Sequence, residues 1–375
     1  MSAPRGLLLA SAALATACGG TSSSPVQPTP VSASSAPSSA TTKALNMRLE
    51  AQLDLATLGA TAGSGNWGFT APDGRRFALT GLNTGLSIVD VTNPASPRNV
   101  GLIPGPASSW REVKTYRQYA YVTTEARPYG LDIIDLGVPD RPVKVRTWDT
   151  TLSSAHSIWI DQDNGLAFVN GTRNAAGQPN GMRILALEPD PTNPREVGSF
   201  STYYSHDSYR RGNVLYLSAI NDGFEALLDV TDPRNPSELT RFATGGRFTH
   251  NAWLTGDSRY IFTTDERPGR PLEGWDIANP MAPRKVSEYI ANPAGIPHNV
   301  MIDGTRLVVS HYTEGVHMLD VSNPERPQLL GFYDTYDAPG SGFFGAWGAY
   351  IFPGSDLIIV SDINGGLFVV RYVRP

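Results

Sequence analysis

One pattern recurs along the chain from about Leu45 onward: a short apolar strand that ends in a proline turn. It appears as LSIVDVTNPASP, LDIIDLGVPDRP, MRILALEPDPTNP, ALLDVTDPRNP, EGWDIANPMAP and VHMLDVSNPERP. After each turn comes another short apolar stretch, followed by a segment that opens with a flat side chain and continues as a hairpin. The repeat therefore predicts an all-β protein built from copies of one unit.

The spacing of these units predicts how many there are. The hairpin segments begin at seven flat side chains, which are Trp67, Trp110, His156, His206, His250, His298 and Trp347. The intervals between them are 43, 46, 50, 44, 48 and 49 residues. A period of about 40–50 residues made of four short strands is typical of a β-propeller blade. We therefore predict a single seven-bladed β-propeller over residues 45–375. The 37 glycines and 30 prolines suit such a turn-rich protein.

The two ends of the repeat predict how the ring closes. The last unit runs WGAYIF, LIIVSD and LFVVRY, and it stops at Pro375 without a fourth strand. Residues 46–55, NMRLEAQLDL, have the pattern of a fourth strand with no unit before them. Pairing these two segments would complete the seventh blade and remove an exposed sheet edge.

An aspartate recurs where the unit enters its proline turn. It stands at Asp90, Asp135, Asp229, Asp276 and Asp320. A carboxylate in this position can accept backbone N–H bonds within the turn. We therefore interpret these aspartates as structural rather than functional.

The N-terminus has the layout of an export signal. A single Arg5 precedes an apolar run from Leu7 to Ala17, which is too short to span a bilayer permanently. We predict a signal peptide over residues 1–17, and the ATAC ending resembles a bacterial lipobox with Cys18 as the lipidated residue. The Ser/Thr/Pro/Ala-rich stretch over residues 18–44 predicts a disordered tether. The alternative is an ordinary signal peptide with an incidental cysteine.

The charge of the chain and the residue after Cys18 indicate which partners and which membrane to expect. The formal net charge is −5 and there is no basic block, which argues against a nucleic-acid partner. Gly19 is not the aspartate that commonly retains lipoproteins at the inner membrane, so the outer membrane or the cell surface is favoured. The expected partners are a membrane, through the lipid on Cys18, and an extracellular or envelope protein or ligand.

The units resemble the LVIVD repeat, and the whole body resembles the choice-of-anchor B family of bacterial surface proteins. The resemblance spans about residues 45–375 and includes AHSIWIDQDNGLAFVNGT, FTHNAWLTGDSRYIFTTDE and PHNVMIDGTRLVVSHYTEGVHMLDVSNPERP. It implies an exported propeller attached to the cell surface. It implies neither a reaction nor any catalytic residue.

Four of the six histidines open four consecutive units. Because all inner strands of a propeller run the same way along the central shaft, these residues would form an arc at one mouth. The arc consists of His156, His206, His250 and His298. One interpretation is that the position holds any flat ring that packs between blades. The other is metal binding, since imidazole is a common ligand of transition metals, and the metal would be one divalent ion of Fe, Zn, Mn or Cu.

Other polar and aromatic residues are candidates for the same mouth. Acidic residues that would orient ligating imidazoles are Glu125, Asp207, Asp265, Glu266 and Asp362. Residues expected to bind a ligand at the mouth are Trp67, Trp110, Arg111 and Trp347. Arg111 and Glu112 fit either a polar pair that seals the ring or a ligand anchor. His311 is a further candidate for this face, whereas His317 fits packing between blades.

Two function classes follow from these residues. The first is a cell-surface lipoprotein whose propeller serves as a binding or scaffold module. The alternative is a metal-dependent enzyme that uses the four histidines, and a third possibility is a purely structural envelope protein. Imidazoles that converge on one point at about 2.0–2.2 Å from a metal would favour the enzyme. Imidazoles that lie flat between blades would argue against it.

Overall fold

A computed structural model of the chain describes residues 43–338 and 342–375. The predicted signal peptide, the predicted lipidation site Cys18 and nearly all of the predicted tether lie outside the described residues. Among the residues that are described, no helix has the length and apolar character needed to cross a membrane.

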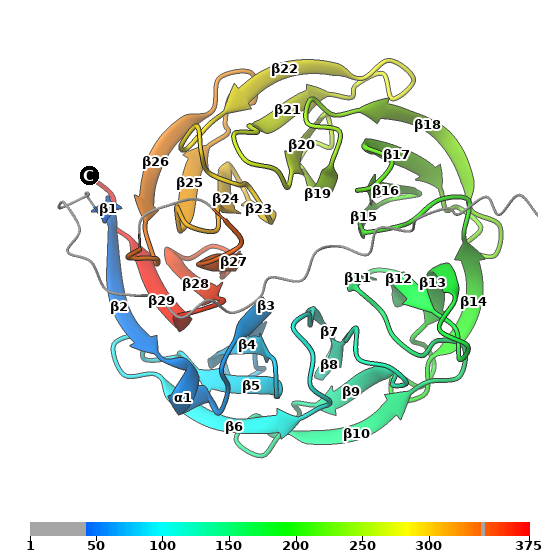
Figure 1. Cartoon of the computed structure of the whole chain (residues 1–375), viewed down its shortest axis with the longest axis horizontal. Coiled ribbons are helices and arrows are strands. Elements are labelled where there is room, and N and C mark those ends of the chain that lie inside the picture. Colours follow the sequence, from blue (N-terminus) through cyan, green and yellow to red (C-terminus); the bar gives the residue numbers. More distant parts are fainter. Residues whose placement is uncertain (1–42, 339–341) are drawn as a thin grey trace, which may run out of the picture. The chain divides into compact units, whose positions relative to one another are not determined.

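Seven antiparallel sheets surround a central shaft, as Figure 1 shows, so the predicted seven-bladed β-propeller is confirmed. Blade one contains β3 (Gly63–Thr70), β4 (Arg76–Leu82), β5 (Gly85–Asp90) and β6 (Arg98–Pro104). Blade two contains β7 (Val113–Tyr116), β8 (Tyr119–Val122), β9 (Leu131–Asp135) and β10 (Val143–Trp148). Blade three contains β11 (Ser157–Asp161), β12 (Leu166–Arg173), β13 (Pro179–Ala186) and β14 (Arg195–Phe200).

The remaining blades repeat this order. Blade four contains β15 (Asp207–Arg211), β16 (Val214–Ala219), β17 (Phe224–Asp229) and β18 (Ser237–Ala243). Blade five contains β19 (Thr249–Leu254), β20 (Tyr260–Asp265), β21 (Leu272–Asp276) and β22 (Arg284–Tyr289). Blade six contains β23 (Val300–Asp303), β24 (Arg306–Ser310), β25 (Val316–Asp320) and β26 (Gln328–Tyr333). Blade seven contains β27 (Ala346–Ile351), β28 (Leu357–Asp362) and β29 (Gly366–Tyr372).

The ring closes through the N-terminal strands, as the sequence predicts. Strand β2 (Met47–Leu53) pairs antiparallel with β29 and supplies the fourth strand of blade seven. Strand β1 (Ala44–Leu45) pairs with β26 and adds a fifth strand to blade six. Helix α1 (Leu55–Leu58), capped by the Asp54 side chain, then leads into blade one. The N-terminal strand β2 therefore covers the edge of β29, the last strand of the chain, and joins the two ends of the ring.

The apolar core lies between neighbouring blades rather than at one centre. Phe77, Leu79 and Ile88 of blade one pack with Val113 and Ala120 of blade two, and all five are fully buried. The middle strands are covered on both faces, which accounts for runs such as SIVD and LIIV that are apolar without strict alternation. Outer strands such as β6 are half exposed.

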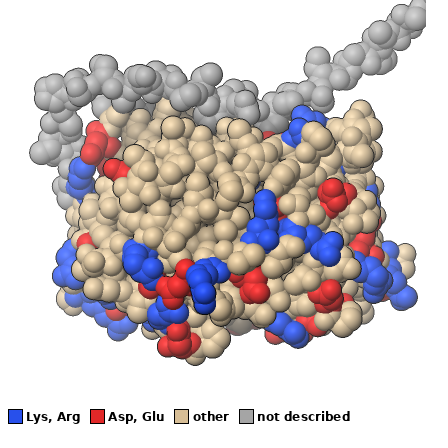
Figure 2. Space-filling model, turned by 90° about the horizontal axis from the view of Figure 1, so that it is seen from below, with Lys and Arg blue, Asp and Glu red and all other residues tan. Residues whose placement is uncertain are grey.

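The turn aspartates have the structural role expected of them. Each carboxylate accepts the backbone N–H of the residue two positions later, at 2.7–3.0 Å in all five turns. Charged side chains gather along the lower half of the rim in Figure 2. Ion pairs between turns, such as Arg75 Nη1 to Asp140 Oδ2 at 2.7 Å, link neighbouring blades.

Candidate functional site

The residue at the head of each inner strand, which we call the arc residue of its blade, stands at a β-bulge or an equivalent irregularity. It is a histidine in blades three to six. In blade five the pairing register shifts between Thr249 and Asn251, so His250 is the extra residue opposite β20. The same shift isolates Trp347 in blade seven. Equivalent backbone contacts, in which the arc residue and the next one face a single residue of the second strand, occur at His156, His206 and His298. Bulges re-aim side chains, and here they direct two consecutive residues per blade toward the shaft.

Hydroxyl groups from one blade hold the backbone of the arc residue in the next. The donors are Thr123, Ser157, Thr264 and Ser310, and they bind the carbonyls of His156, His206, His298 and Trp347 at 2.6–2.9 Å. Ser157, Thr264 and Ser310 lie on one of the two innermost strands of their blades, and Thr123 directly follows β8. The relative position of neighbouring arc residues is therefore set by hydrogen bonds as well as by packing.

The four histidines form a continuous arc of neighbouring rings. The ring centroids are 4.2 Å apart for His156 and His206, 4.5 Å for His206 and His250, and 4.2 Å for His250 and His298. Neighbouring planes are tilted by 39–59°. The Trp347 ring continues the arc, 5.0 Å from His298. All five side chains are buried.

The structure gives the predicted aromatic residues three different places. In blades one and two the arc position holds Gly65 and Arg111, each directly before a residue that lines the shaft. Trp67 lies two residues beyond that position, under the Lys114 ammonium, 4.5 Å from the ring centroid. Trp110 lies one residue before it, and its ring contacts Trp347 with centroids 6.2 Å apart.

Arg111 and Glu112 do not pair with each other. The Arg111 guanidinium is buried and donates to the backbone carbonyls of Leu82 and Pro106, and burial lowers its pKa. It therefore seals the seam between blades one and two. Glu112 instead accepts the Trp347 indole N–H at 3.1 Å and faces the shaft.

A carboxylate stands at each end of the arc. At one end Glu125 Oε1 lies 2.6 Å from His156 Nδ1. At the other, Glu266 lies 3.6 Å from His298 Nε2 and 3.9 Å from His250 Nε2. Both glutamates follow the second strand of their blades. The two ends differ in charge balance, because only Glu125 is hydrogen bonded to an imidazole.

The protonation of the arc follows from burial and from these partners. Burial lowers the pKa of His206 and His250 well below the usual value, and it lowers that of His298 to about 3. Burial also opposes protonation of His156, but the hydrogen bond and charge of Glu125 raise its pKa overall. Burial raises the pKa of Glu266 to about 7. At neutral pH the rings of His206, His250 and His298 are therefore neutral, whereas the pKa of His156 is shifted in the opposite direction.

The other acidic candidates have separate roles. Asp265 accepts the backbone N–H groups of Gly246 and Phe248 at 2.7 and 2.8 Å, so it shapes the loop before β19. Asp362 accepts those of Asn364 and Gly365 at 2.8 and 2.7 Å. Both are therefore turn-forming residues and do not orient imidazoles. Asp207 is the exception, because it faces the shaft.

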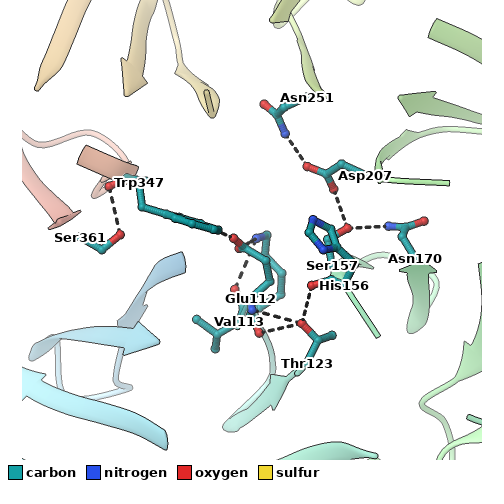
Figure 3. A network of polar contacts seen from close by, with 12 residues as sticks. Glu112, Val113, Thr123, His156, Ser157, Asn170, Asp207, Asn251, Trp347 and Ser361 are labelled. Carbon is teal, nitrogen blue, oxygen red and sulfur yellow. Dashed lines mark hydrogen bonds and ion pairs between the residues drawn. The ribbon is translucent and has the colours of Figure 1, made fainter. Parts of the chain in front are cut away.

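Below the arc, the shaft holds a polar cavity that is lined by all seven blades. We call it the shaft cavity, and its polar lining consists of Asn66, Glu112, Lys114, Ser157, Asp207, Ser208, Asn251 and Asn299. Asp207 accepts the Asn251 amide at 2.6 Å and the Ser157 hydroxyl at 3.2 Å, as Figure 3 shows. Lys114 Nζ lies 3.7 Å from Glu112. Burial raises the pKa of Glu112 and of Asp207, and the Lys114 charge opposes that shift.

Aromatic rings line the cavity further along the inner strands. The centroids of Trp159, Tyr209 and Trp253 are 4.5–5.3 Å from one another. The cavity is small, with about 40 Å³ open to the centres of water molecules. Lys114, Asn66 and Ser157 were not among the cavity residues predicted from the sequence. Their spacing could have identified them, because Asn66 and Ser157 directly follow the arc residues Gly65 and His156, and Lys114 stands three residues after Arg111.

His311 and His317 form a separate cluster. Their ring centroids are 5.2 Å apart, and His317 Nδ1 lies 2.8 Å from the Tyr289 hydroxyl of blade five. His311 is buried, and neither of its ring nitrogens has a hydrogen-bond partner in the part of the chain that the structure describes. Burial lowers its pKa well below the usual value. His311 therefore packs with His317, which confirms the interpretation of His317 as a packing residue.

Comparison with known families identifies the repeat. The LVIVD repeat family matches residues 78–103, which cover most of β4 to β6, and residues 294–335, which cover blade six. These two segments therefore match the LVIVD repeat. The second match includes His298 of the arc, Tyr312 and the four consecutive strands β23 to β26 of blade six. None of the curated proteins compared with this chain matches significantly.

Several solved structures are similar in fold to this chain, and one of them is described as a β-propeller domain. The Cps50 (Swd1) β-propeller domain of Myceliophteria thermophila aligns with a TM-score of 0.60 and 11% identity, over 87% of this chain and 99% of that one. A Lactobacillus plantarum protein aligns with a TM-score of 0.60, 13% identity and coverage of 74% and 84%. The periplasmic gluconolactonase PpgL of Pseudomonas aeruginosa aligns with a TM-score of 0.55 and 12% identity, over 72% of this chain and 85% of that one. At these identities the likeness concerns the fold alone.

Proposed function

We propose that the protein is an exported, lipid-anchored member of the choice-of-anchor B family, and that its propeller binds a small polar ligand in the shaft cavity. The LVIVD matches support the family assignment, and the ATAC sequence before Gly19 supports lipidation at Cys18. The propeller then acts as a binding module at the outer membrane or cell surface.

The observation that carries the binding role is the composition of the shaft cavity. Inner strands built from one repeat could fill the shaft with the same apolar residue in each blade. Here the positions after the arc hold Asn66, Glu112, Ser157, Asp207, Asn251, Asn299 and Gly348. Burying carboxylates and an ammonium destabilises a fold unless partners offset the loss of hydration. A set of unlike polar groups at equivalent positions is therefore better explained by recognition than by packing.

The lining also indicates the chemistry of the ligand. Glu112 and Asp207 offer acceptors, Lys114 offers a cationic donor, and Asn299 offers an amide with both functions. The flanking rings of Trp159 and Trp253 exclude water and provide flat apolar faces. Together with the limited volume, this favours a compact ligand that carries both hydrogen-bond donors and an anionic or acceptor group.

Ligand screening with a matched pair of lysine variants tests this role. The full chain, K114M and K285M would be screened against a metabolite library by thermal shift. Lys285 is a suitable control because it lies on the outer strand β22 and pairs there with Glu288. We expect hits that stabilise the wild type and K285M but not K114M. Hits that stabilise K114M equally would contradict binding in the shaft cavity.

Metabolic labelling tests the anchor independently. Cells that express the full chain would be grown with an alkyne-tagged fatty acid, and the protein would be examined for the tag. We expect incorporation that is lost in C18S, together with digestion of the propeller by protease added to intact cells. Labelling of C18S, or full protection of the propeller in intact cells, would contradict the proposed anchoring and location.

A further inference from the structure

The end of the arc next to blade six brings three metal-binding side chains together. One ligand atom each from His250, Glu266 and His298 lie within 4.8 Å of one another. The individual separations from Glu266 are 3.9 Å to His250 Nε2 and 3.6 Å to His298 Nε2. Tetrahedral coordination with bonds of about 2.0–2.2 Å requires ligand atoms roughly 3.4 Å apart. The two Glu266 contacts are within about 0.5 Å of that spacing, with Oε2 nearest His250 and Oε1 nearest His298.

Surrounding groups already orient two of the three side chains. The Trp347 carbonyl accepts a hydrogen bond from His298 Nδ1–H, and His298 Nε2 then faces Glu266. The Tyr312 hydroxyl donates to Glu266 Oε1 at 2.5 Å and holds the carboxylate in place. Histidines that bind metals usually donate their second ring N–H to such an acceptor, and ligating carboxylates are likewise hydrogen bonded.

His250 has an orphaned nitrogen that ring packing does not explain. Its Nδ1 is buried and has no hydrogen-bond partner among residues 43–338 and 342–375. Its Nε2 lies 3.9 Å from Glu266 Oε2. Buried polar groups are almost always hydrogen bonded, and a flat apolar ring would pack here without leaving a nitrogen unpaired. Ring packing alone therefore does not explain an imidazole in this position, and its Nε2 is the nitrogen that lies toward Glu266.

The two ends of the arc also differ in their need for a cation. Glu125 is balanced by the His156 imidazole at 2.6 Å. The Glu266 side chain is 13% exposed and lies beside His250 and His298, and its hydrogen-bond donor is the Tyr312 hydroxyl. A buried carboxylate is stabilised by a charge partner or by a bound metal. Among residues 43–338 and 342–375, no lysine or arginine forms an ion pair with Glu266, whose charged-group neighbours are the two imidazoles.

We propose that His250, Glu266 and His298 form a binding site for one divalent transition metal ion. Two imidazoles and a carboxylate are the ligand set of many zinc sites that leave a fourth position to water or another ligand. The same set also suits ferrous iron, so the class is a first-row divalent ion with borderline ligand preference. His156 lies outside the site and is held by Glu125. The proposal is thus narrower than a four-histidine centre, and it is independent of the ligand proposed for the shaft cavity.

Zinc titration of the full chain, purified with a tag that contains no histidine, tests this site. After treatment with a chelator, the protein would be titrated with zinc chloride against a chromophoric chelator, and bound zinc would be counted by mass spectrometry. We expect one equivalent per chain, and at least a 100-fold weaker Kd in both E266Q and H298A. E266Q keeps the side-chain volume, so it remains informative if H298A fails to fold.

Two further variants separate this site from its alternatives. H156A removes a ring of the arc outside the proposed site, and we expect its Kd to stay within 3-fold of the wild-type value. Y312F removes the hydrogen bond to Glu266, and we expect a 10- to 100-fold weaker Kd. Equal losses in H156A and H298A would overturn the three-ligand site. Binding of no zinc by the wild type, or unchanged affinity in E266Q, would overturn the proposal as a whole.

Discussion

Glu225 provides a pH-dependent test of how this propeller tolerates buried charge. It lies on β17, is fully buried, and accepts the Ser218 hydroxyl at 2.7 Å through Oε2. Its Oε1 is buried without a partner among the described residues. Burial raises its pKa from 4.5 to about 8, although the Ser218 hydrogen bond opposes that shift. The change examined is E225Q, which keeps the shape and removes the titration.

The sign and size of the effect follow from proton linkage. Below about pH 4.5 Glu225 is protonated in both the folded and the unfolded chain, so it adds no pH dependence. Between pH 4.5 and 8 the unfolded chain releases the proton and the folded chain retains it, so the free energy of unfolding falls as the pH rises. The shift corresponds to at most about 5 kcal/mol at 1.36 kcal/mol per unit. Because Gln does not titrate, E225Q should gain stability over the wild type as the pH rises, by several kcal/mol at pH 8.

Urea unfolding of the full chain at several pH values between 5 and 8.5 measures this difference. The relevant quantity is the free energy of unfolding of E225Q minus that of the wild type, because other buried carboxylates titrate equally in both. E238Q is the control, since Glu238 lies exposed on β18 of the same blade. We expect E238Q to change the free energy of unfolding little, because the side chain is exposed. A difference for E225Q that does not vary with pH would show that Glu225 is ionised in the folded protein, and it would refute the reasoning.

Two further predictions concern packing. Closure through β2 predicts that M47A and L53A each lower the free energy of unfolding by roughly 2–5 kcal/mol, because both side chains are buried in the seam. L45A should change it little, because Leu45 is exposed. Urea denaturation with all three variants checks this, and equal small effects would contradict closure by β2. A Cβ at Gly68 would overlap the Tyr350 ring, so G68A should cost about 1–3 kcal/mol, while G101A meets nothing within 4 Å. Thermal unfolding of the pair checks the prediction, which fails if both melt alike.

The blade count and the closure were predictable because they rest on periodicity and on apolar pattern. Seven flat side chains at near-constant spacing are enough to count the blades, and a lone strand at one end with a three-stranded unit at the other indicates how they pair. The role of the turn aspartates was predictable for the same reason. Asp135 and its equivalents act locally, and their partner is always the backbone two residues later.

The site was predictable only in part, because bulges and loops depend on single residues. A bulge adds one residue to a strand, which is too small a change to be seen in the spacing of the blades. For this reason Trp67 and Trp110 fit the spacing of the repeat, although Gly65 and Arg111 occupy the equivalent positions in the structure. The partner of a carboxylate near a strand end depends on the shape of the adjoining loop. For this reason Asp265 binds backbone N–H groups, whereas Glu266, its neighbour in sequence, faces the imidazoles.

Whether the mouth of the shaft binds a metal or only packs flat rings is decided most directly by anomalous diffraction. Crystals of the zinc-treated protein would be measured on both sides of the zinc absorption edge. We expect one strong peak at about 2.0–2.2 Å from His250 Nε2, His298 Nε2 and a Glu266 oxygen. A map with no peak at these three residues, from protein that retains its histidine arc, would contradict a metal site and leave the imidazoles as packing residues.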